Sequence, residues 1–294
     1  MVERLSFSRR LFLIVNYTAL IATALVCILP LAHVLALSFS SNAAATSGYV
    51  KLWPVEFTLK SYEFVLSRPA FMKSLLVTLE RVAIGLPLNL LLTILIAYPL
   101  SKESSRFKLR TAYVWYFVFT MLFSGGLIPT YMTVNKAGLL DSIWALVLPG
   151  AVPVFNVVLL LNFFRGLPKE LEEAAFIDGA GHFRTLWKIY FPLSLPAIAT
   201  IALFTTVGHW NSWFDGLIYM NSPDHYPLQS YLQTVIASRD MTLASSTDLE
   251  LLAEVSDRTV KAAQIFMGAL PILLVYPFLQ RYFVKGIVLG SVKE

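Results

Sequence analysis

The sequence predicts an all-α integral membrane protein with six transmembrane helices. Hydrophobic residues make up 57% of its 294 residues and charged residues only 14%, against about a quarter in soluble domains. Six intervals with almost no charge are each long enough for a helix to cross a hydrocarbon core of about 30 Å. Helices are expected because lipid offers no partner for backbone amides. The expected spans are about 11–39, 82–101, 112–134, 143–164, 194–214 and 262–281.

The distribution of basic residues predicts the orientation of these spans. The N-terminal segment 1–10, the second and fourth connections and the C-terminal end together hold 14 basic and 7 acidic residues. The other side holds 9 basic and 11 acidic residues. By the positive-inside rule, both termini are therefore cytoplasmic. The net charge of +5 is read as a topology signal, and no nucleic-acid-binding motif accompanies it.

The first span follows three arginines, as a signal peptide would. Its apolar run is too long for a signal sequence, and no small-residue cleavage site follows closely, so it is expected to be retained. The outer segment that follows has apolar side chains at helical spacing over residues 59–66, which predicts a short helix at the membrane interface. A second outer segment, 215–260, is expected to form an extracytoplasmic lobe that docks an external partner.

The fourth connection, residues 165–193, predicts a helix and a turn. Pro168 suits the start of a helix, and acidic residues in the first turns complement the positive end of the helix dipole. Small and mostly apolar residues recur at i, i+3, i+4 and i+7 from Leu171, which would let another protein approach closely. Gly179 and Gly181 permit the turn that follows. On this pattern alone, an ordinary cytoplasmic amphipathic hairpin is an equal alternative.

The run from Glu172 to Gly181 resembles the EAA loop of permease subunits in bacterial carbohydrate ABC importers, a binding-protein-dependent transport family. The segments 209–215, 226–229 and 282–293 are similar to the oligosaccharide branch, so the resemblance covers nearly the whole chain. Phe191 departs from the Leu that the family often has before Pro192, but both are apolar.

The resemblance implies a type I ABC importer permease fold in the bacterial cytoplasmic (inner) membrane. This chain would form half of a translocation pathway that works by alternating access, with a second homologous permease chain, two ATPase subunits and an extracytoplasmic solute-binding protein as partners. The tail residues Lys285 and Lys293 would contact the ATPase. The residues implied to couple to the ATPase are Glu172, Glu173, Ala174, Ala175, Asp178, Gly179, Ala180 and Gly181. A frayed basic terminus that serves only topology is the alternative for the tail.

Missing motifs narrow the function. The chain has no G-x-x-x-x-G-K-[ST] phosphate loop, so we expect no enzyme activity and no cofactor in this chain, with ATP and Mg bound by separate ATPase subunits. No carboxylate lies in the middle of a span, which disfavours a secondary carrier or channel. An integral membrane enzyme lacks a convergent catalytic set. The four histidines show no metal-ligand spacing, so no metal site is expected.

The outer end of the fifth span is a candidate sugar path. Trp210, Asn211, Trp213 and Asp215 combine flat aromatic faces with groups that bind hydroxyls. Aromatic residues also anchor helices at membrane interfaces, and the partner permease could hold the sugar instead. The identity of the sugar stays open, between neutral oligosaccharides and acidic ones such as alginate fragments.

Overall fold

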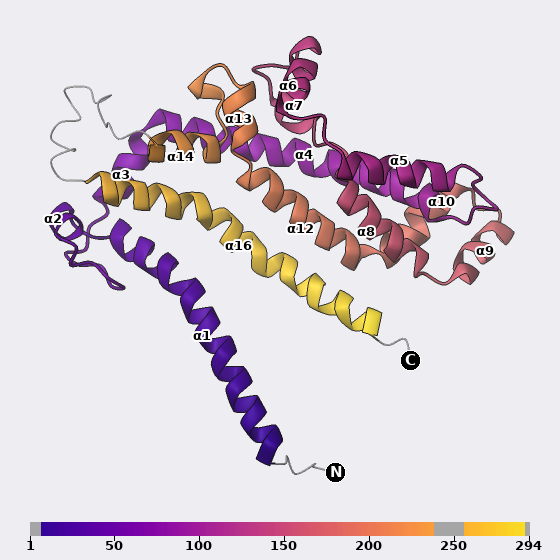
Figure 1. The fold of residues 1–294 in the computed structure, drawn as a ribbon, viewed down its shortest axis with the longest axis horizontal. Helices are drawn as coiled ribbons and strands as arrows, with labels where there is room; N and C mark the ends of the chain where they lie inside the picture. Colours follow the sequence, from indigo (N-terminus) through magenta and orange to yellow (C-terminus); the bar gives the residue numbers. More distant parts are fainter. Residues whose placement is uncertain (1–6, 238–255, 292–294) are drawn as a thin grey trace. The chain divides into compact units, whose positions relative to one another are not determined.

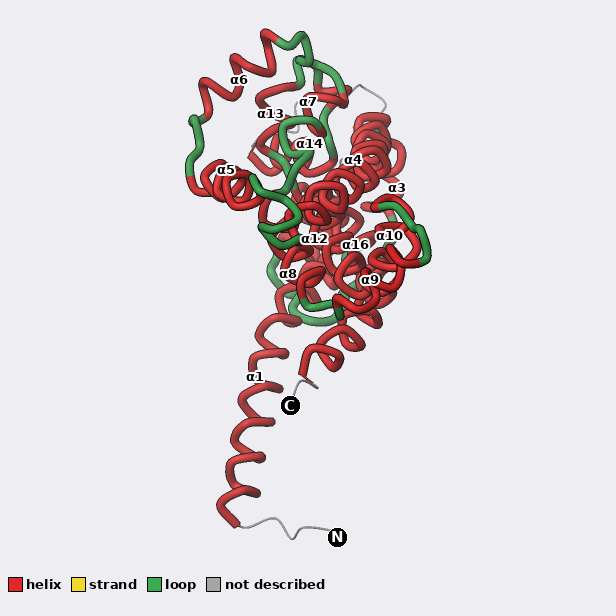
Figure 2. The backbone as a smooth tube through the Cα atoms, turned by 90° about the vertical axis from the view of Figure 1, so that its right-hand side faces the viewer, coloured by secondary structure: helices red, strands yellow, loops and turns green. Residues whose placement is uncertain are grey.

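The computed structural model describes residues 7–237 and 256–291, and every regular element in these ranges is a helix, drawn in red in Figure 2. The chain divides into two compact units. One comprises residues 1–69 and 234–270, and the other residues 70–233 and 271–294. Figure 1 labels the helices along the chain. The predicted all-helical fold class is confirmed.

Candidate membrane spans take three forms in the described residues. Single helices long and apolar enough are α1 (Phe7–Ser38), α4 (Pro69–Ser101) and the first part of α16 (Asp257–Ser291). Bent pairs are α5 (Arg110–Leu122) with α6 (Leu127–Lys136), at 111°, and the helices of His182–Leu193 with α12 (Leu195–Asn211), at 81°. The apolar helix α8 (Val154–Arg165) is shorter, at 12 residues. The expected span boundaries therefore stay a prediction.

Glycine and proline account for the interruptions. The pair Gly125 and Gly126 separates α5 from α6 within the interval expected as the third span. The interval expected as the fourth span holds two helices, α7 (Ile143–Val147) and α8, with Pro149 and Pro153 in the segment between them. Because proline lacks an N–H donor and clashes with the preceding turn, a helix tends to end before it.

The first unit is built on α1. Most of its apolar side chains are exposed, and its buried residues are Ala36 and Ser38. The following segment folds back onto the end of α1, where the Ser38 hydroxyl lies 2.7 Å from the Tyr62 hydroxyl. Tyr62 belongs to α3 (Lys60–Ser67), the helix that the spacing of residues 59–66 predicts.

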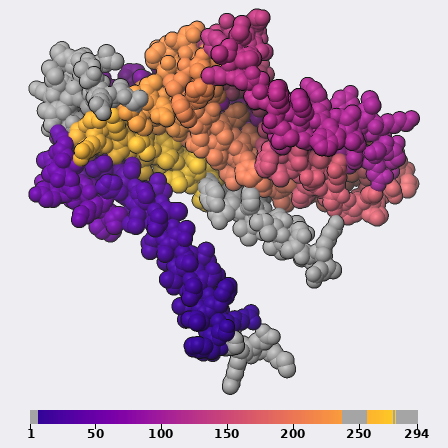
Figure 3. All heavy atoms as spheres, in the orientation of Figure 1, coloured from indigo at the N-terminus to yellow at the C-terminus, as the bar shows by residue number. Residues whose placement is uncertain are grey.

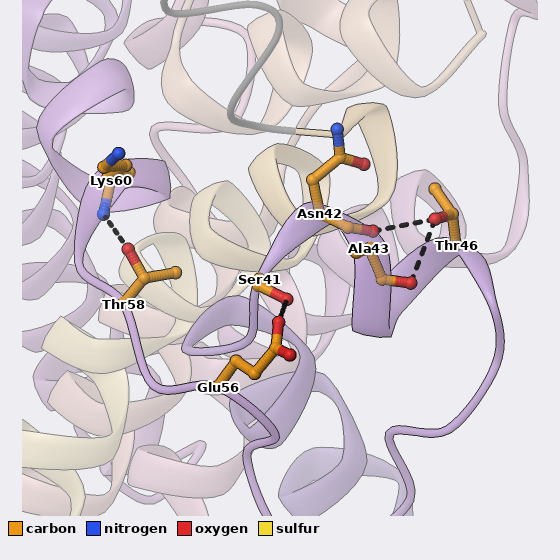
Figure 4. Close-up of a pocket in the computed structure, with 7 residues that line it drawn as sticks. All are labelled: Ser41, Asn42, Ala43, Thr46, Glu56, Thr58 and Lys60. Atoms are coloured by element: carbon orange, nitrogen blue, oxygen red, sulfur yellow. Dashed lines mark hydrogen bonds between the residues drawn. The ribbon is translucent and has the colours of Figure 1, made fainter.

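A polar hollow between α2 (Asn42–Thr46) and the approach to α3 is shown in Figure 4. Ser41 caps α2, since its hydroxyl oxygen accepts a hydrogen bond from the Ala44 amide at 3.2 Å. The same hydroxyl donates to the Glu56 carboxylate, and these contacts fix the loop.

The second unit has its main core where α4, α8 and α12 meet the helical connection between α9 (Lys169–Ile177) and α12. This connection consists of α10 (His182–Thr185), the π-helix η1 (Leu186–Tyr190) and α11 (Phe191–Leu193). The buried residues of this core are Ile94, Ala97, Tyr98, Leu100, Val157, Leu160, Leu161, Phe164, Leu186, Tyr190, Ile198 and Ile201. Burial of this apolar surface packs η1 against α4, α8 and α12.

A smaller core joins α6, α7 and α13 (Phe214–Tyr219) through residues such as Val134, Leu146 and Tyr219. The 3₁₀ turn η2 (Pro223–His225) and α14 (Leu228–Ala237) follow. The helix α5 contributes no buried residue, and Figure 3 shows its atoms in magenta at the surface. Such an apolar face suits lipid or a partner subunit.

Candidate functional site

The turn after α9 has the geometry that the glycine spacing predicts. Gly179 has a φ of +77°, a backbone conformation that L side chains rarely adopt. The Gly179 amide donates to the Phe176 carbonyl at 3.1 Å, and the Ala180 amide donates to the Ala175 carbonyl at 2.9 Å. This pair of hydrogen bonds is a Schellman motif, which ends α9 and reverses the chain into α10.

Glu172 is the most constrained residue of α9. It is only 5% exposed, and three side chains bind its carboxylate. The Lys102 ammonium donates to Oε2 at 2.9 Å, the Arg106 guanidinium donates to Oε1 at 3.1 Å, and the Tyr190 hydroxyl donates to Oε2 at 2.7 Å. Lys102 and Arg106 lie in the segment after α4, and Tyr190 is the last residue of η1. The Glu172 carboxylate therefore connects α9 both to the end of α4 and to η1.

Aromatic rings complete this Glu172 cluster. The Lys102 ammonium lies 3.8 Å from the ring centroid of Tyr98 and 4.0 Å from that of Tyr190. A desolvated cation over aromatic faces is worth about 2 kcal/mol or more. The buried charge is thus compensated by a carboxylate and by two rings.

The protonation of the cluster follows from opposing effects. Burial alone would raise the pKa of the Glu172 carboxyl, but hydrogen bonds from Tyr190 and Lys102 and the nearby positive charges bring that pKa below its ordinary value. Burial, and then the bond to Glu172, raises the pKa of Tyr190. Burial lowers the pKa of Lys102, against the attraction of Glu172. The contacts are those of an ionised carboxylate with a neutral phenol.

The other predicted coupling residues divide between two faces of α9. Ala175 is buried beside Glu172, whereas Glu173 and Ala174 are exposed. Glu173 lies 3.6 Å from Arg106. Ile177, at the end of the helix, is 85% exposed. Of the predicted residues at the turn, Ala180 is half-buried, and the others, Asp178, Gly179 and Gly181, are exposed. The site therefore has an inner anchoring face and an exposed outer face that carries both charged and apolar side chains.

A second polar cluster centres on Arg81 in α4. Arg81 is 3% exposed, and its guanidinium donates through two nitrogens to the Asp215 carboxylate, one of them at 3.2 Å to Oδ1. It also donates to the Leu146 carbonyl at 3.1 Å. The pair joins α4 to the start of α13. At 1.5 Å per residue, Arg81 and Lys102 are about 30 Å apart along α4, close to the thickness of a hydrocarbon core.

His209 extends the Arg81 cluster across to α12. Its Nδ1 accepts from Arg81 Nε at 3.3 Å, and its Nε2 faces the Asn89 side-chain oxygen at 3.4 Å. This arrangement suits a neutral imidazole with one acceptor and one donor nitrogen. Gly85 faces the ring, and a Cβ at that position would lie 2.5 Å from His209 Nε2. Glycine at this position leaves room for the buried His209 ring against α4.

The predicted sugar-path residues fall around the end of α12. Trp210 is 4% exposed, whereas Asn211 and Trp213 are exposed at the break before α13. Asp215 is half-buried in its pair with Arg81. The structure thus brings Asp215 into the Arg81 cluster and leaves Asn211 and Trp213 accessible.

The predicted tail contacts lie outside the part of the chain that the structure describes. Lys285 lies on the backbone of α16, with its side chain outside the described part, and Lys293 lies outside the described residues.

The sequence did not predict which residues pair with the carboxylates of Glu172 and Asp215. Lys102 and Arg106 counted only toward the basic charge of the second connection, and Arg81 was given no role. A charged residue within or beside an apolar interval is costly unless paired, and that cost was the available signal that Arg81 has a buried partner.

Comparison with known proteins identifies a family for this chain. A family model described as "Binding-protein-dependent transport system inner membrane component" matches residues 66–288. The chain is 42% identical to Protein LplC of Bacillus subtilis (strain 168), over 97% of this chain and 95% of that protein. It is 41% identical to the polygalacturonan/rhamnogalacturonan transport system permease protein YtcP of the same organism, over 97% of this chain and 99% of that protein.

A solved structure is similar over almost its whole length. It is a chain of a bacterial ABC transporter involved in the import of the acidic polysaccharide alginate, with a TM-score of 0.87 and 35% sequence identity, covering 95% of this chain and 98% of that chain.

Proposed function

The chain belongs to the family of inner membrane components of binding-protein-dependent transport systems, and from this premise we propose that it is one permease subunit of an ATP-driven oligosaccharide importer. It forms half of the translocation pathway together with a second, homologous permease chain. An extracytoplasmic solute-binding protein delivers the sugar. Two separate ATPase subunits bind ATP and Mg and supply the energy, so this chain itself is not an enzyme.

The observation that carries the coupling proposal is the double attachment of α9. Through Glu172, the helix is tied to the end of α4 and to η1, which leads into α12. A force applied to the outer face of α9 therefore reaches two candidate spans at once. In this proposal Glu172 positions α9, while Glu173, Ala174 and the exposed end of the helix contact the ATPase.

Alternating access then follows from rigid-body motion. Closure of the ATPase pair moves the α9 helices of the two permease chains together. Since each α9 is fixed to its own bundle, the two bundles rotate, and the pathway changes from inward-facing to outward-facing. The residues Lys285 and Lys293 are proposed to add contacts between the tail and the ATPase.

The names of the relatives favour an acidic oligosaccharide as cargo. One relative is named for polygalacturonan and rhamnogalacturonan, and the similar structure imports the acidic polysaccharide alginate. We propose that Asn211 and Trp213 line the path and that Trp210 and Asp215 support them from within. Asn211→Ala should lower uptake while the yield of the complex is unchanged; an unchanged uptake rate would exclude Asn211 from the path.

The coupling proposal is tested by reversing one exposed charge. Glu173→Lys removes an acceptor for a basic residue of the ATPase, a charge-assisted hydrogen bond worth about 1.5 to 3 kcal/mol. Uptake and substrate-stimulated ATP hydrolysis should both fall roughly tenfold or more while the chain still inserts. Glu170→Lys, an equally exposed change on the same helix, is the matched control. Wild-type coupling in the Glu173 variant would exclude this contact.

A further inference from the structure

A charged cleft of about 280 Å³ lies between the ends of α4 and α8 and the start of α5. Five basic and three acidic side chains line it. The acidic side chains are Glu103, Glu172 and Glu173, and each is paired with Lys102, Arg106 or Lys169. The remaining two basic side chains, Arg110 and Arg165, have no carboxylate partner among the residues that the structure describes. The cleft therefore has an excess of two positive charges.

The Arg110 guanidinium is poorly satisfied. Its Nε is buried without a hydrogen-bond acceptor. Its two terminal nitrogens have only long contacts, 3.4 Å to the Lys102 carbonyl and 3.4 Å to the Thr111 hydroxyl. A buried donor without a partner is unusual in a folded protein, and the long contacts of the terminal nitrogens leave the guanidinium with unused donor capacity in a positively charged cleft.

Arg165 is held next to Arg110. One of its terminal nitrogens donates to the Leu100 carbonyl at 3.2 Å, so both guanidinium groups lie against the carbonyl end of α4. Burial first, and then the charge of Arg110, lowers the pKa of Arg165. The negative end of a helix dipole carries only about half a charge, which leaves the two guanidinium groups incompletely neutralised.

The surroundings of the two arginines are those of a membrane interface. Arg110 is the first residue of α5, and Arg165 is the last of α8. The next turns of α5 expose Tyr113, Trp115 and Tyr116, residues typical of the boundary between lipid headgroups and acyl chains. A ligand with an anionic head and an apolar body fits this combination better than an acidic side chain of a soluble partner.

We propose that Arg110 and Arg165 bind the phosphate of an anionic phospholipid, with the acyl chains lying along the exposed face of α5. Guanidinium groups bind phosphate through paired, charge-assisted hydrogen bonds, and basic pockets between transmembrane helices bind anionic headgroups. The positive-inside pattern places this lipid in the cytoplasmic leaflet.

The test measures lipid affinity, so it does not depend on transport. The full-length chain is purified in detergent, and binding of phosphatidylglycerol and of phosphatidylcholine is measured by native mass spectrometry. Wild type should prefer phosphatidylglycerol. Arg110→Gln with Arg165→Gln should weaken its binding roughly thirtyfold, because each basic residue near an anionic surface contributes a factor of about five.

The matched control is Lys108→Gln with Arg184→Gln, which removes two exposed charges that do not line the cleft. It should bind phosphatidylglycerol like wild type. Equal loss in both double variants would mean general charge attraction and would overturn the proposal. So would competition by inorganic phosphate alone at equal concentration, or unchanged binding of phosphatidylglycerol in the Arg110 and Arg165 variant.

Discussion

Glu172 and Glu173 are adjacent in the predicted coupling motif but lie in different surroundings in the structure. From the sequence, Glu172 and Glu173 are two neighbouring acidic residues on a helix expected to face the ATPase. In the structure, the Glu172 carboxylate points inward to Lys102, Arg106 and Tyr190, and only Glu173 remains exposed. Since a helix turns by 100° per residue, adjacent residues reach different surroundings. The role of both residues in coupling stays a prediction.

The Glu172 cluster should make stability depend on pH. The folded-state pKa of Glu172 is below its ordinary value of 4.5, so the ionised carboxylate stabilises the fold above that value. This stabilisation is lost as the pH falls through the lowered pKa. Glu172→Gln should reduce stability by about 3 kcal/mol at pH 7, because it leaves the Lys102 charge buried without its counter-charge.

Thermal unfolding of the two proteins in detergent between pH 7 and pH 3 checks this. The difference in melting temperature should be largest at pH 7 and should shrink below about pH 4.5. Glu170→Gln, an exposed change on the same helix, should leave the melting temperature unchanged. A difference between wild type and Glu172→Gln that does not vary with pH would show that the carboxylate charge is not what stabilises the site.

The Schellman turn after α9 depends on Gly179. Gly179 has a φ of +77° and open space around it, so a side chain there meets backbone strain without a clash. Gly179→Val should cost at least about 1–2 kcal/mol and misplace the start of α10. Gly179→Asn should cost less, because asparagine tolerates this conformation better. Substrate-stimulated ATP hydrolysis in the assembled complex should follow the same order, and equal activities would contradict this role.

The contact between α4 and α12 depends on Gly85. Gly85→Ala should displace the His209 ring from its contacts with Arg81 and Asn89 and lower the melting temperature, because its Cβ would overlap that ring. Gly208→Ala, on α12, is the matched control, since no atom lies within 4 Å of a Cβ there. That change should be neutral or stabilising by up to about 1 kcal/mol. A melting temperature unchanged by Gly85→Ala would show that the approach is not tight.

At the scale of the whole molecule, the sequence predicts the class of fold better than its details. Apolar intervals indicate an all-helical membrane protein, and the spacing of residues 168–181 indicates the helix and turn of the candidate site. The bend after Leu122 and the division of 143–164 into two helices were not predicted, because apolar composition does not show where glycine and proline interrupt a span. The partners of Glu172 and Asp215 were missed because long-range ion pairs leave no local pattern.

Two ionic clusters lie near the two ends of the apolar stretch of α4. The Arg81 cluster and the Glu172 cluster lie about one hydrocarbon thickness apart along the same helix. In the proposed function, α4 would transmit the motion of α9 from the Glu172 cluster to the Arg81 cluster. The chain would then depend on its partners for all transport.

Reconstitution tests this dependence most directly. Proteoliposomes would contain either this chain alone or this chain with the second permease, the ATPase subunits and the solute-binding protein. Accumulation of an acidic oligosaccharide is then measured with ATP, without ATP, and with a proton or sodium gradient. We predict ATP-dependent accumulation by the full assembly and none by this chain alone. Gradient-driven uptake by this chain alone would contradict the proposed function.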